Sequence, residues 1–329
     1  MCCEIFALLR ALKRFYCGRP RGARPFSFEI LREFVGSDWK WPRGRGNPQR
    51  AMDVFSDVRE TSGWKESKFK AGASEVLLVY PLIRHFLDVV VPADVLVRER
   101  TSFNLCCEVV DLTQCVKLRG MRHMPELKRQ INAFLKSHVE AYAQEFVIPK
   151  HHYMCHMTRQ AEEDGVWLDC FVHERKHQVT KDCSESIKNT VDFEGSVLTT
   201  VVHATIERLR HSVAPDELLE PTAPCQELSD AFHVPCRVSN WMRFQFVRIA
   251  VGDLLFCGEG ACLVEACVTS GEEFALLVEP LALIERPSRT TSRWGRSRAK
   301  EMLRLAPGLT HHAACWHMRS DATILALGR

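Results

Sequence analysis

Apolar side chains recur at helical spacing through most of the first 211 residues. Over residues 4–17 they fall three or four positions apart, and this spacing predicts a helix that Gly18 and Pro20 end. The most apolar stretch, residues 69–91, predicts a core helix that Pro81 kinks or ends. The same period predicts further helices over residues 24–35, 102–116, 124–142 and 192–211. We therefore expect a mainly helical domain over residues 1–211.

The apolar period changes from helical spacing to alternation after Cys236. Short runs of Val, Phe, Leu and Ile are separated by glycine-containing turns, which predicts four to six antiparallel strands in a small barrel-like domain over residues 234–285. Residues 212–235 hold four prolines and no period, so we place a linker over residues 212–233. Residues 286–329 are expected to form a basic tail that is mobile at its start. The fold class is therefore α+β.

Charge is distributed unevenly along the chain, although the net charge is only +3. Residues 253–285 hold seven acids and no Lys or Arg, whereas residues 286–304 hold seven bases and one acid. The loop over residues 36–50 combines bases with two tryptophans, which fits either a solvated loop or a nucleic-acid contact. The bases that we predict to contact DNA are Lys40, Arg43, Arg45, Arg50, Arg286, Arg289, Arg293, Arg296, Arg298, Lys300 and Arg304.

The cysteines and the first residues bear on the cellular compartment. None of the fifteen cysteines forms a C-x-x-C pair, and most have apolar neighbours, as buried free thiols do. The apolar start of the chain is interrupted by Glu4 and Arg10, so it predicts neither a signal peptide nor a membrane span. We therefore expect reduced cysteines and an intracellular protein with no membrane partner. The sequence offers no sign of a small-molecule substrate.

Residues 173–177 read His-Glu-Arg-Lys-His and match the H-E-x-x-H pattern of zinc hydrolases. On a helix the two imidazoles would hold zinc, and the carboxylate of Glu174 would act as the base. Three features disfavour that interpretation. The preceding run resembles a strand, the two middle residues are cations, and Glu194 and His203 are candidate third ligands without a second motif. A zinc metallohydrolase is therefore kept as an alternative only.

Five of the fourteen histidines fall within residues 151–177, the strongest local anomaly of the sequence. His152 and His156 lie one helical turn apart, and so do His173 and His177. These four side chains are candidate ligands of a structural zinc ion. Polar histidines in a helical interface, with hydrogen bonds to their neighbours and no metal, are the favoured alternative.

The same region carries a family pattern. A Lys-x-His-Tyr element, a second His, a Gly, and then Glu-x-Lys-His with a later Lys and Asn occur in order. The matching residues are Lys150, His152, Tyr153, His156, Gly165, Phe171, Glu174, Lys176, His177, Lys181 and Asn189. This block resembles one found in CACTA-type transposases of transposon-rich genomes, and it covers about a fifth of the chain, roughly residues 149–211.

The resemblance implies a DNA-associated protein and a ribonuclease-H-like core whose acids hold two Mg²⁺ ions. The region before residue 149 predicts helices instead of the central sheet of that core, so the nuclease core is expected to be absent. Glu174 is the one acid placed where a third carboxylate of such a site would sit. We expect a transposon-derived binding protein without catalysis, in the nucleus rather than the cytoplasm, with DNA as its partner. A protein-interaction module is the remaining alternative.

Overall fold

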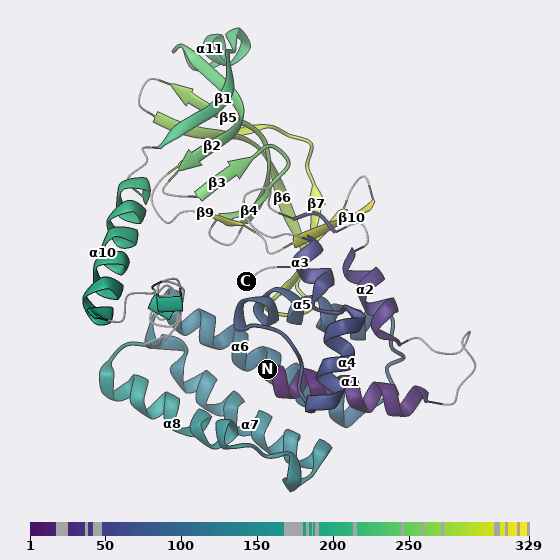
Figure 1. Ribbon diagram of the computed structural model, residues 1–329. Coiled ribbons are helices and arrows are strands. Elements are labelled where there is room, and N and C mark those ends of the chain that lie inside the picture. Colours follow the sequence, from purple (N-terminus) through teal and green to yellow (C-terminus); the bar gives the residue numbers. More distant parts are fainter. Residues whose placement is uncertain are drawn as a thin grey trace.

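The chain folds into a helical body and an antiparallel sheet that contact each other (Figure 1). The computed structural model describes residues 1–17, 26–36, 39–41, 48–167, 180–181, 184–185, 187, 191–212, 216–244, 247–257, 260–270, 273–305, 310–312, 315–320 and 323–327. The predicted α+β class is confirmed, with helices in the first part of the chain and strands in the second.

The helical body is built from amphipathic helices around one large apolar core. Buried side chains such as Leu8, Leu31 and Phe86 come from three different helices and pack together. Burial of this apolar surface is the main favourable term in folding such a body. The helices are α1 (Cys2–Tyr16), α2 (Phe28–Gly36), α3 (Pro48–Asp53), α4 (Asp57–Glu66), α5 (Ala73–Val89), α6 (Val97–Arg119), α7 (Met124–Tyr142) and α8 (Pro149–Asp164).

Local residues explain where α5 begins and how it continues through a proline. Glu75 in the first turn of α5 accepts the backbone N–H of Gly72 at 2.8 Å and also pairs with Arg59 at 2.9 Å. That carboxylate satisfies one of the donors that every helix start exposes. The expectation that Pro81 ends this helix is only half right, because α5 continues through Pro81 to Val89. Packing of its buried residues against the core offsets the hydrogen bond that the proline removes.

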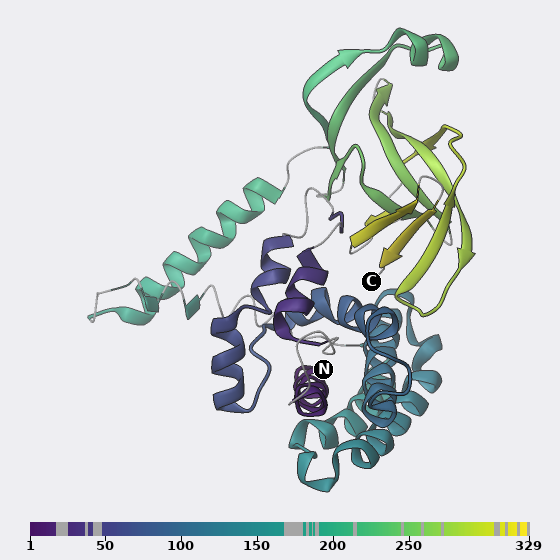
Figure 2. The same cartoon turned by 90° about the vertical axis from the view of Figure 1, so that its right-hand side faces the viewer.

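A further helix, α10 (Phe193–Ser212), stands beside this body (Figure 2). Its Leu198, Val202 and Ile206 lie four positions apart and are exposed, Leu198 by 65%. The segment after it, expected as a linker, instead forms β1 (Glu217–Pro224) and the short helix α11 (Gln226–Phe232). Pro221 and Pro224 fit because β1 lies at the edge of the sheet, where fewer backbone N–H groups are needed for pairing.

All described strand pairs are antiparallel. The main path runs β1–β2–β5–β6–β7–β11–β10, and its central strands β5 and β6 contribute to two apolar clusters. The five strands over residues 236–285 agree with the predicted four to six. The strands after β1 are β2 (Cys236–Phe244), β3 (Val247–Ala250), β4 (Leu254–Cys257), β5 (Gly260–Ser270), β6 (Glu273–Glu285), β7 (Thr291–Arg296), β8 (Glu301–Arg304), β9 (Thr310–His312), β10 (Cys315–Ser320) and β11 (Thr323–Leu327).

Residues 286–329 were expected to form a basic tail outside the β domain, mobile at its start, but much of the described part of this segment forms strands of the sheet. β7 pairs with both β6 and β11, and Trp294 in β7 is 1% exposed. Trp294, Trp316 and Ile324 from this segment form an apolar cluster with residues of β4, β5 and β6. This segment carries apolar residues among its bases, and those residues complete the second apolar cluster of the sheet.

Contacts between the helical body and the sheet hold the two parts together. Lys40 and Trp316 form a β-bridge through two backbone hydrogen bonds of 2.7 and 2.9 Å. Beside it, the rings of Trp39 and His317 lie 5.7 Å apart. Leu325 of β11 is buried within the apolar core of the helices. The C-terminal strands are therefore anchored on the N-terminal half of the chain.

Candidate ligand pocket and the predicted sites

An apolar pocket of about 490 Å³ lies where the start of α1 meets α5, α6, α7 and α8. Its volume and its mainly apolar surface are those of small-molecule sites in proteins. The lining residues are Met1, Cys2, Cys3, Ala73, Val76, Leu77, Val110, Thr113, Gln114, Phe134, Ile148, Lys150, His151, Tyr153, Met154 and Met157. A second hollow, of about 460 Å³, contains Arg10, Arg14 and Glu99 and is therefore much more polar.

The polar end of the pocket is formed by the first turn of α8. Pro149 starts this helix, and Lys150 follows as the one fully charged side chain among the described lining residues. The first turn of α8 holds no acidic residue. A helix start carries partial positive charge, so Lys150 adds to an excess of positive charge there. This end of the pocket therefore favours an anion or a hydrogen-bond acceptor.

A buried Glu–His pair lies beneath that end. Glu4 Oε2 is 2.7 Å from His138 Nδ1, and the two side chains are 1% and 2% exposed. The other ring nitrogen of His138, Nε2, lies 3.3 Å from the carbonyl oxygen of Phe146. His138 also packs against His151, with the two ring centroids 4.4 Å apart. The pair thus holds His138 in a fixed orientation behind the pocket wall.

His151 connects this pair to the pocket that it lines. Its Nδ1 accepts the backbone N–H of Ile148 at 3.4 Å, so the proton of the neutral ring resides on Nε2. Burial, together with the nearby His138, lowers the pKa of His151 to about 4. At neutral pH this side chain is therefore an uncharged donor through Nε2.

Sequence reasoning missed Glu4 and His138 as a pair. They lie 134 positions apart, and no local motif links them. A signal did exist, because Glu4 is one turn before the buried Leu8 of α1, and His138 is one turn after the buried Phe134 of α7. Two polar residues of opposite charge type on the apolar faces of two helices indicate a buried pair.

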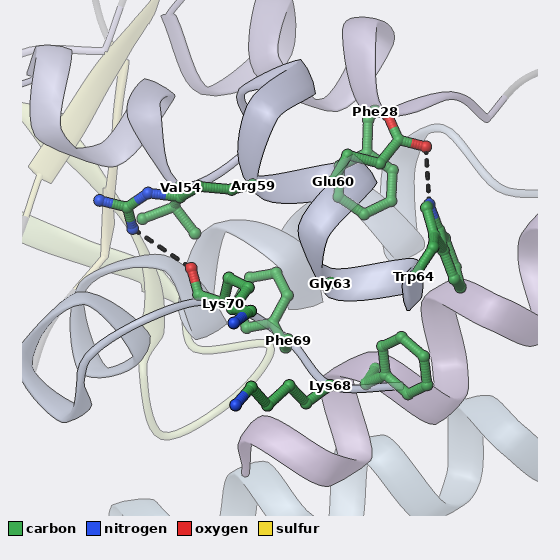
Figure 3. A pocket seen from close by; sticks show the side chains of 10 residues that line it. Phe28, Val54, Arg59, Glu60, Gly63, Trp64, Lys68, Phe69 and Lys70 are labelled. Atoms are coloured by element: carbon green, nitrogen blue, oxygen red, sulfur yellow. Dashed lines mark hydrogen bonds between the residues drawn. The ribbon is translucent and has the colours of Figure 1, made fainter. Parts of the chain in front are cut away.

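The crevice between α1, α2 and α4, drawn in Figure 3, is far smaller than the pocket. Its cavity is about 10 Å³, which is at most the space of one water molecule. Trp64 Nε1 donates to Glu60 Oε1 at 2.9 Å, and Arg59 donates to the carbonyl oxygen of Lys70 at 3.2 Å. These contacts fill the crevice, which is therefore part of the packed body and no ligand site.

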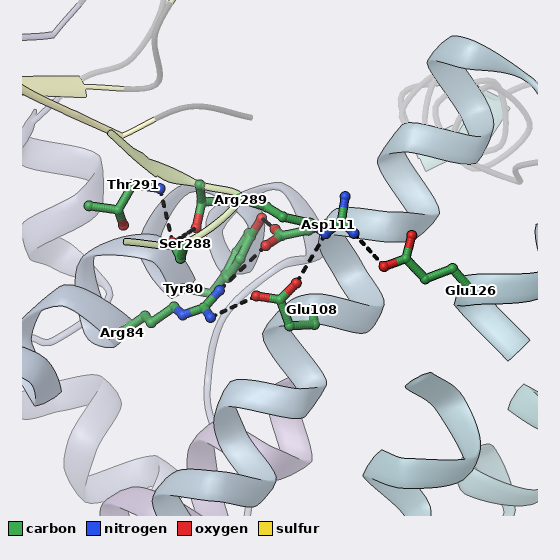
Figure 4. Close-up of polar contacts among 9 residues, drawn as sticks. Tyr80, Arg84, Glu108, Asp111, Glu126, Ser288, Arg289 and Thr291 are labelled. Atoms are coloured by element: carbon green, nitrogen blue, oxygen red, sulfur yellow. Dashed lines mark hydrogen bonds and ion pairs between the residues drawn. The ribbon is translucent and has the colours of Figure 1, made fainter. Parts of the chain in front are cut away.

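A chain of polar contacts joins α5, α6 and α7 to the segment before β7 (Figure 4). Tyr80 donates to Asp111 at 2.5 Å, while Arg84 contacts Asp111 at 3.5 Å and Glu108 at 2.7 Å. Arg289 continues the chain, since its side chain contacts Glu108 at 3.2 Å. Burial raises the pKa of Asp111 to about 6 despite these donors.

The structure brings two of the four predicted zinc ligands together. His152 and His156 are exposed on α8, with their Nε2 atoms 3.0 Å apart. His173, His177 and Glu174 lie outside the described residues, so the H-E-x-x-H element is not described. Within the described part of the chain, no three His, Cys, Asp or Glu side chains are grouped as a metal site would require.

The transposase-like block is only partly described. Lys150, His152, Tyr153 and His156 all lie on α8, and Gly165 ends that helix in the left-handed conformation with φ of 67°. Lys181 is exposed in a short helical segment. Phe171, Glu174, Lys176, His177 and Asn189 lie outside the described residues. The first part of the block thus belongs to the helix that carries the polar end of the pocket.

Five of the eleven bases predicted to contact DNA pair with acids of the same chain. Arg296 forms two contacts of 3.1 Å with Glu279, whose side chain is 3% exposed. Arg289 pairs with Glu126 at 2.5 Å as well as with Glu108. The remaining pairs are Arg293–Glu285 at 3.3 Å, Lys300–Glu265 at 3.6 Å and Arg304–Glu273 at 3.7 Å. The acidic block over residues 253–285 therefore neutralises much of the basic segment that follows it.

The other predicted bases are less constrained or not described. Arg286 and Lys40 are exposed, and the exposed Arg298 donates its backbone N–H to Glu279 at 2.9 Å. Arg43 and Arg45 lie outside the described residues. Arg50 belongs to α3, but its side chain is not described. The described bases therefore do not form a continuous unpaired surface for phosphates.

Comparisons with protein-family models, with curated proteins and with solved structures give no match. None of the described helices has the length and apolar character needed to cross a membrane.

Proposed function

We propose that this chain is a binding module whose pocket holds an apolar molecule with one anionic end. The single observation that carries the proposal is the 490 Å³ pocket with Lys150 as its charged lining residue. Val76, Leu77 and Val110 provide an apolar wall from two helices. A ligand that buries an aliphatic or aromatic body there gains about 25 cal/mol for each Å² of apolar surface removed from water.

Two donors support an anionic or acceptor group at the polar end. Lys150 supplies a positive charge, and His151 supplies its Nε2 hydrogen while it remains neutral. The start of the 16-residue helix α8 adds the partial positive charge of its peptide dipoles. A carboxylate with a medium-length apolar chain satisfies all of these groups, whereas a cationic amphiphile would be repelled.

The test is direct binding of three probes with equal chain length and different head groups: decanoate, decanol and decyltrimethylammonium. Calorimetry below the micelle concentration is expected to give the tightest binding for decanoate. Lys150→Glu should weaken decanoate binding by about three- to tenfold, because a partly exposed ionic contact contributes about 0.6–1.4 kcal/mol. Binding of decanol should change little, since it carries no charge.

Arg159→Glu is the matched control for charge, because Arg159 lies on the same helix, is 73% exposed and does not line the pocket. Occlusion of the pocket is tested with Ala73→Trp at its exposed edge and Val110→Phe in its wall. Both variants should lose binding of decanoate and decanol while their melting curves show a folded chain. Saturable binding that these two variants leave unchanged would refute the pocket as the site.

DNA association, which the transposase resemblance implies, is a second proposal. Four exposed bases favour it: Arg286, Arg298, Lys300 and Arg304. The ion pairs of Lys300 and Arg304 are long, and these side chains are 60% and 80% exposed. Exposed pairs of this kind are weak, so phosphates can replace the carboxylates at little cost.

Deletion of residues 286–304 is unsuitable as a test, because it would remove β7 and β8 from the sheet. Replacing the four bases by Gln should instead flatten the log–log salt dependence of DNA binding by about 3–4 units. The control replaces four exposed bases of α7 and α8, Lys128, Arg129, Lys136 and Arg159, and should leave the slope unchanged. Equal slopes for wild type and the first variant would exclude this segment as a phosphate contact.

A further inference from the structure

Two thiols face each other across the hairpin of β4 and β5. The Sγ atoms of Cys257 and Cys262 lie 3.6 Å apart. In the strand register Cys257 pairs with Gly260, and Cys262 pairs with Leu255. The two cysteines are therefore diagonal neighbours whose side chains point to the same face of the sheet. Closing the remaining gap to a disulfide requires a movement of about 1.6 Å, because the S–S bond length is about 2.05 Å.

The two thiols differ in access and in acidity. Cys257 is half-buried at the end of β4, whereas Cys262 is 4% exposed in the core of the sheet. The hydrogen bond with Cys262 lowers the pKa of the Cys257 thiol, and the same bond raises the pKa of Cys262. The more accessible thiol is thus also the more nucleophilic one, which is the arrangement of a reactive and a resolving cysteine.

We propose that Cys257 and Cys262 form a reversible disulfide when the chain meets hydrogen peroxide. The thiolate of Cys257 attacks the peroxide, an S–O bond forms, the O–O bond breaks and one water leaves. Cys262 then attacks that sulfur, the S–S bond forms, the S–O bond breaks and a second water leaves. Two thiols are oxidised to one disulfide while one peroxide is reduced to two waters. A thiol reductant reverses the change.

The disulfide would alter strands beyond the hairpin. Residues 255–257 of β4 also pair with β9, where Cys257 lies opposite Thr310. Drawing the two sulfur atoms together pulls the end of β4 toward β5 and away from this second partner. We therefore expect oxidation to weaken the pairing of β4 with β9 while β5 and β6 remain paired.

The sequence allows a sharp experiment on the full-length chain. Glu259 separates Cys257 from Cys262, and Glu265 separates Cys262 from Cys267. The folded chain is treated with hydrogen peroxide, its free thiols are blocked, and it is digested after both glutamate and arginine residues, since Arg237, Arg243 and Arg248 separate Cys236 from Cys257. Mass spectrometry is expected to show the Cys257 and Cys262 peptides joined, with a loss of two hydrogen atoms that a reductant restores.

Three variants test the roles of the thiols. Cys257→Ser should leave Cys262 reduced, because the buried thiol does not meet peroxide. Cys262→Ser should leave a sulfenic acid on Cys257 that dimedone traps. Cys267→Ser is the matched control, since Cys267 is buried in the same cluster and bonds to the carbonyl oxygen of Ile249, and it should behave as wild type.

Several results would overturn the proposal. One is a dominant link between Cys262 and Cys267, or between two chains. Another is oxidation of Cys262 at an unchanged rate in Cys257→Ser. A third is a Cys257–Cys262 link that appears only after the chain has been unfolded by denaturant.

Discussion

Glu4 Oε2 in the first turn of α1 and His138 Nδ1 in α7 are 2.7 Å apart and almost completely removed from water. The contact joins two helices that are 134 positions apart in sequence. Glu4 Oε1 is buried without a hydrogen-bond partner among the described residues. The pair therefore depends on one strong contact. If either side chain is removed, the other stays buried without its partner of opposite charge type.

Glu4→Ala is expected to destabilise the chain by about 3–5 kcal/mol, because it leaves the buried His138 without its carboxylate. Glu29→Ala is the matched control, since Glu29 is an exposed acid in the first turn of α2. Its loss should cost only about 0.3–1 kcal/mol through the helix dipole. Urea unfolding measures both changes, and similar values for the two variants would contradict a special role of the Glu4–His138 pair.

The pH dependence of the unfolding free energy should reveal the raised pKa of Asp111. Its folded pKa of about 6 is above the ordinary value of 3.8 for an Asp side chain, so the folded chain holds this proton more tightly. The resulting stability is fully present below about pH 4 and is lost as pH rises through 6, a change of roughly 3 kcal/mol. Asp111→Asn should remove this loss, since the amide oxygen still accepts the hydrogen bond of Tyr80. Urea unfolding of the wild type and of Asp111→Asn from pH 4 to pH 7 measures this difference.

His151 acts in the opposite direction over the same pH range. Its pKa is lowered from 6.5 to about 4, so the stability that it contributes is present above pH 6.5 and is lost as pH falls toward 4. The two contributions partly cancel in the wild type. Asp111→Asn should therefore be least stable near pH 4, whereas His151→Gln should become less stable as pH rises. Parallel profiles for both variants would contradict these assignments.

Arg296 should contribute far more to the unfolding free energy than the exposed bases near it. Arg296→Ala leaves the buried carboxylate of Glu279 with the Arg298 backbone N–H as its remaining hydrogen-bond donor among the described contacts. We expect a loss of about 3 kcal/mol in unfolding free energy. Arg304→Ala removes a pair that is exposed on both sides and should change stability by less than about 0.5 kcal/mol. Thermal melting at matched salt distinguishes the two, and equal shifts would show that burial of Glu279 is unimportant.

We expect zinc to bind the His152–His156 pair only weakly, because the described residues supply no third ligand. Tetrahedral zinc with bonds of about 2.0–2.1 Å separates two nitrogens by about 3.3 Å, close to the 3.0 Å observed here. His156→Ala should weaken binding by about tenfold or more, because one of two chelating imidazoles is gone. His203→Ala on α10 is the control for an exposed histidine. Calorimetric titration decides the matter, and equal affinities in both variants would place the metal elsewhere.

The sequence by itself determined α1, α2, α5, α6, α7 and α10 and the antiparallel strands over residues 236–285, whereas α3, α4 and α8 were not predicted from it. The spacing of apolar residues along a helix or strand is a local property of the sequence. An element that buries one face needs this spacing whatever it packs against. The pair Leu8 and Leu12 shows this, since their spacing alone predicts the buried face of α1. The same local reasoning located the exposed His152 and His156 on one helix face, because residues four apart are neighbours on any helix.

Only the tertiary structure decided which charged side chains pair and which residues line the pocket. Arg296 and Glu279 appear in the sequence as parts of a basic tail and an acidic block, but strand pairing places them in contact. The pocket beside Lys150 draws residues from five helices, and Glu4 meets His138 across 134 positions. Such contacts depend on how whole elements pack, because the energy of a charge or an apolar surface is set by its neighbours in space and not by its neighbours in sequence.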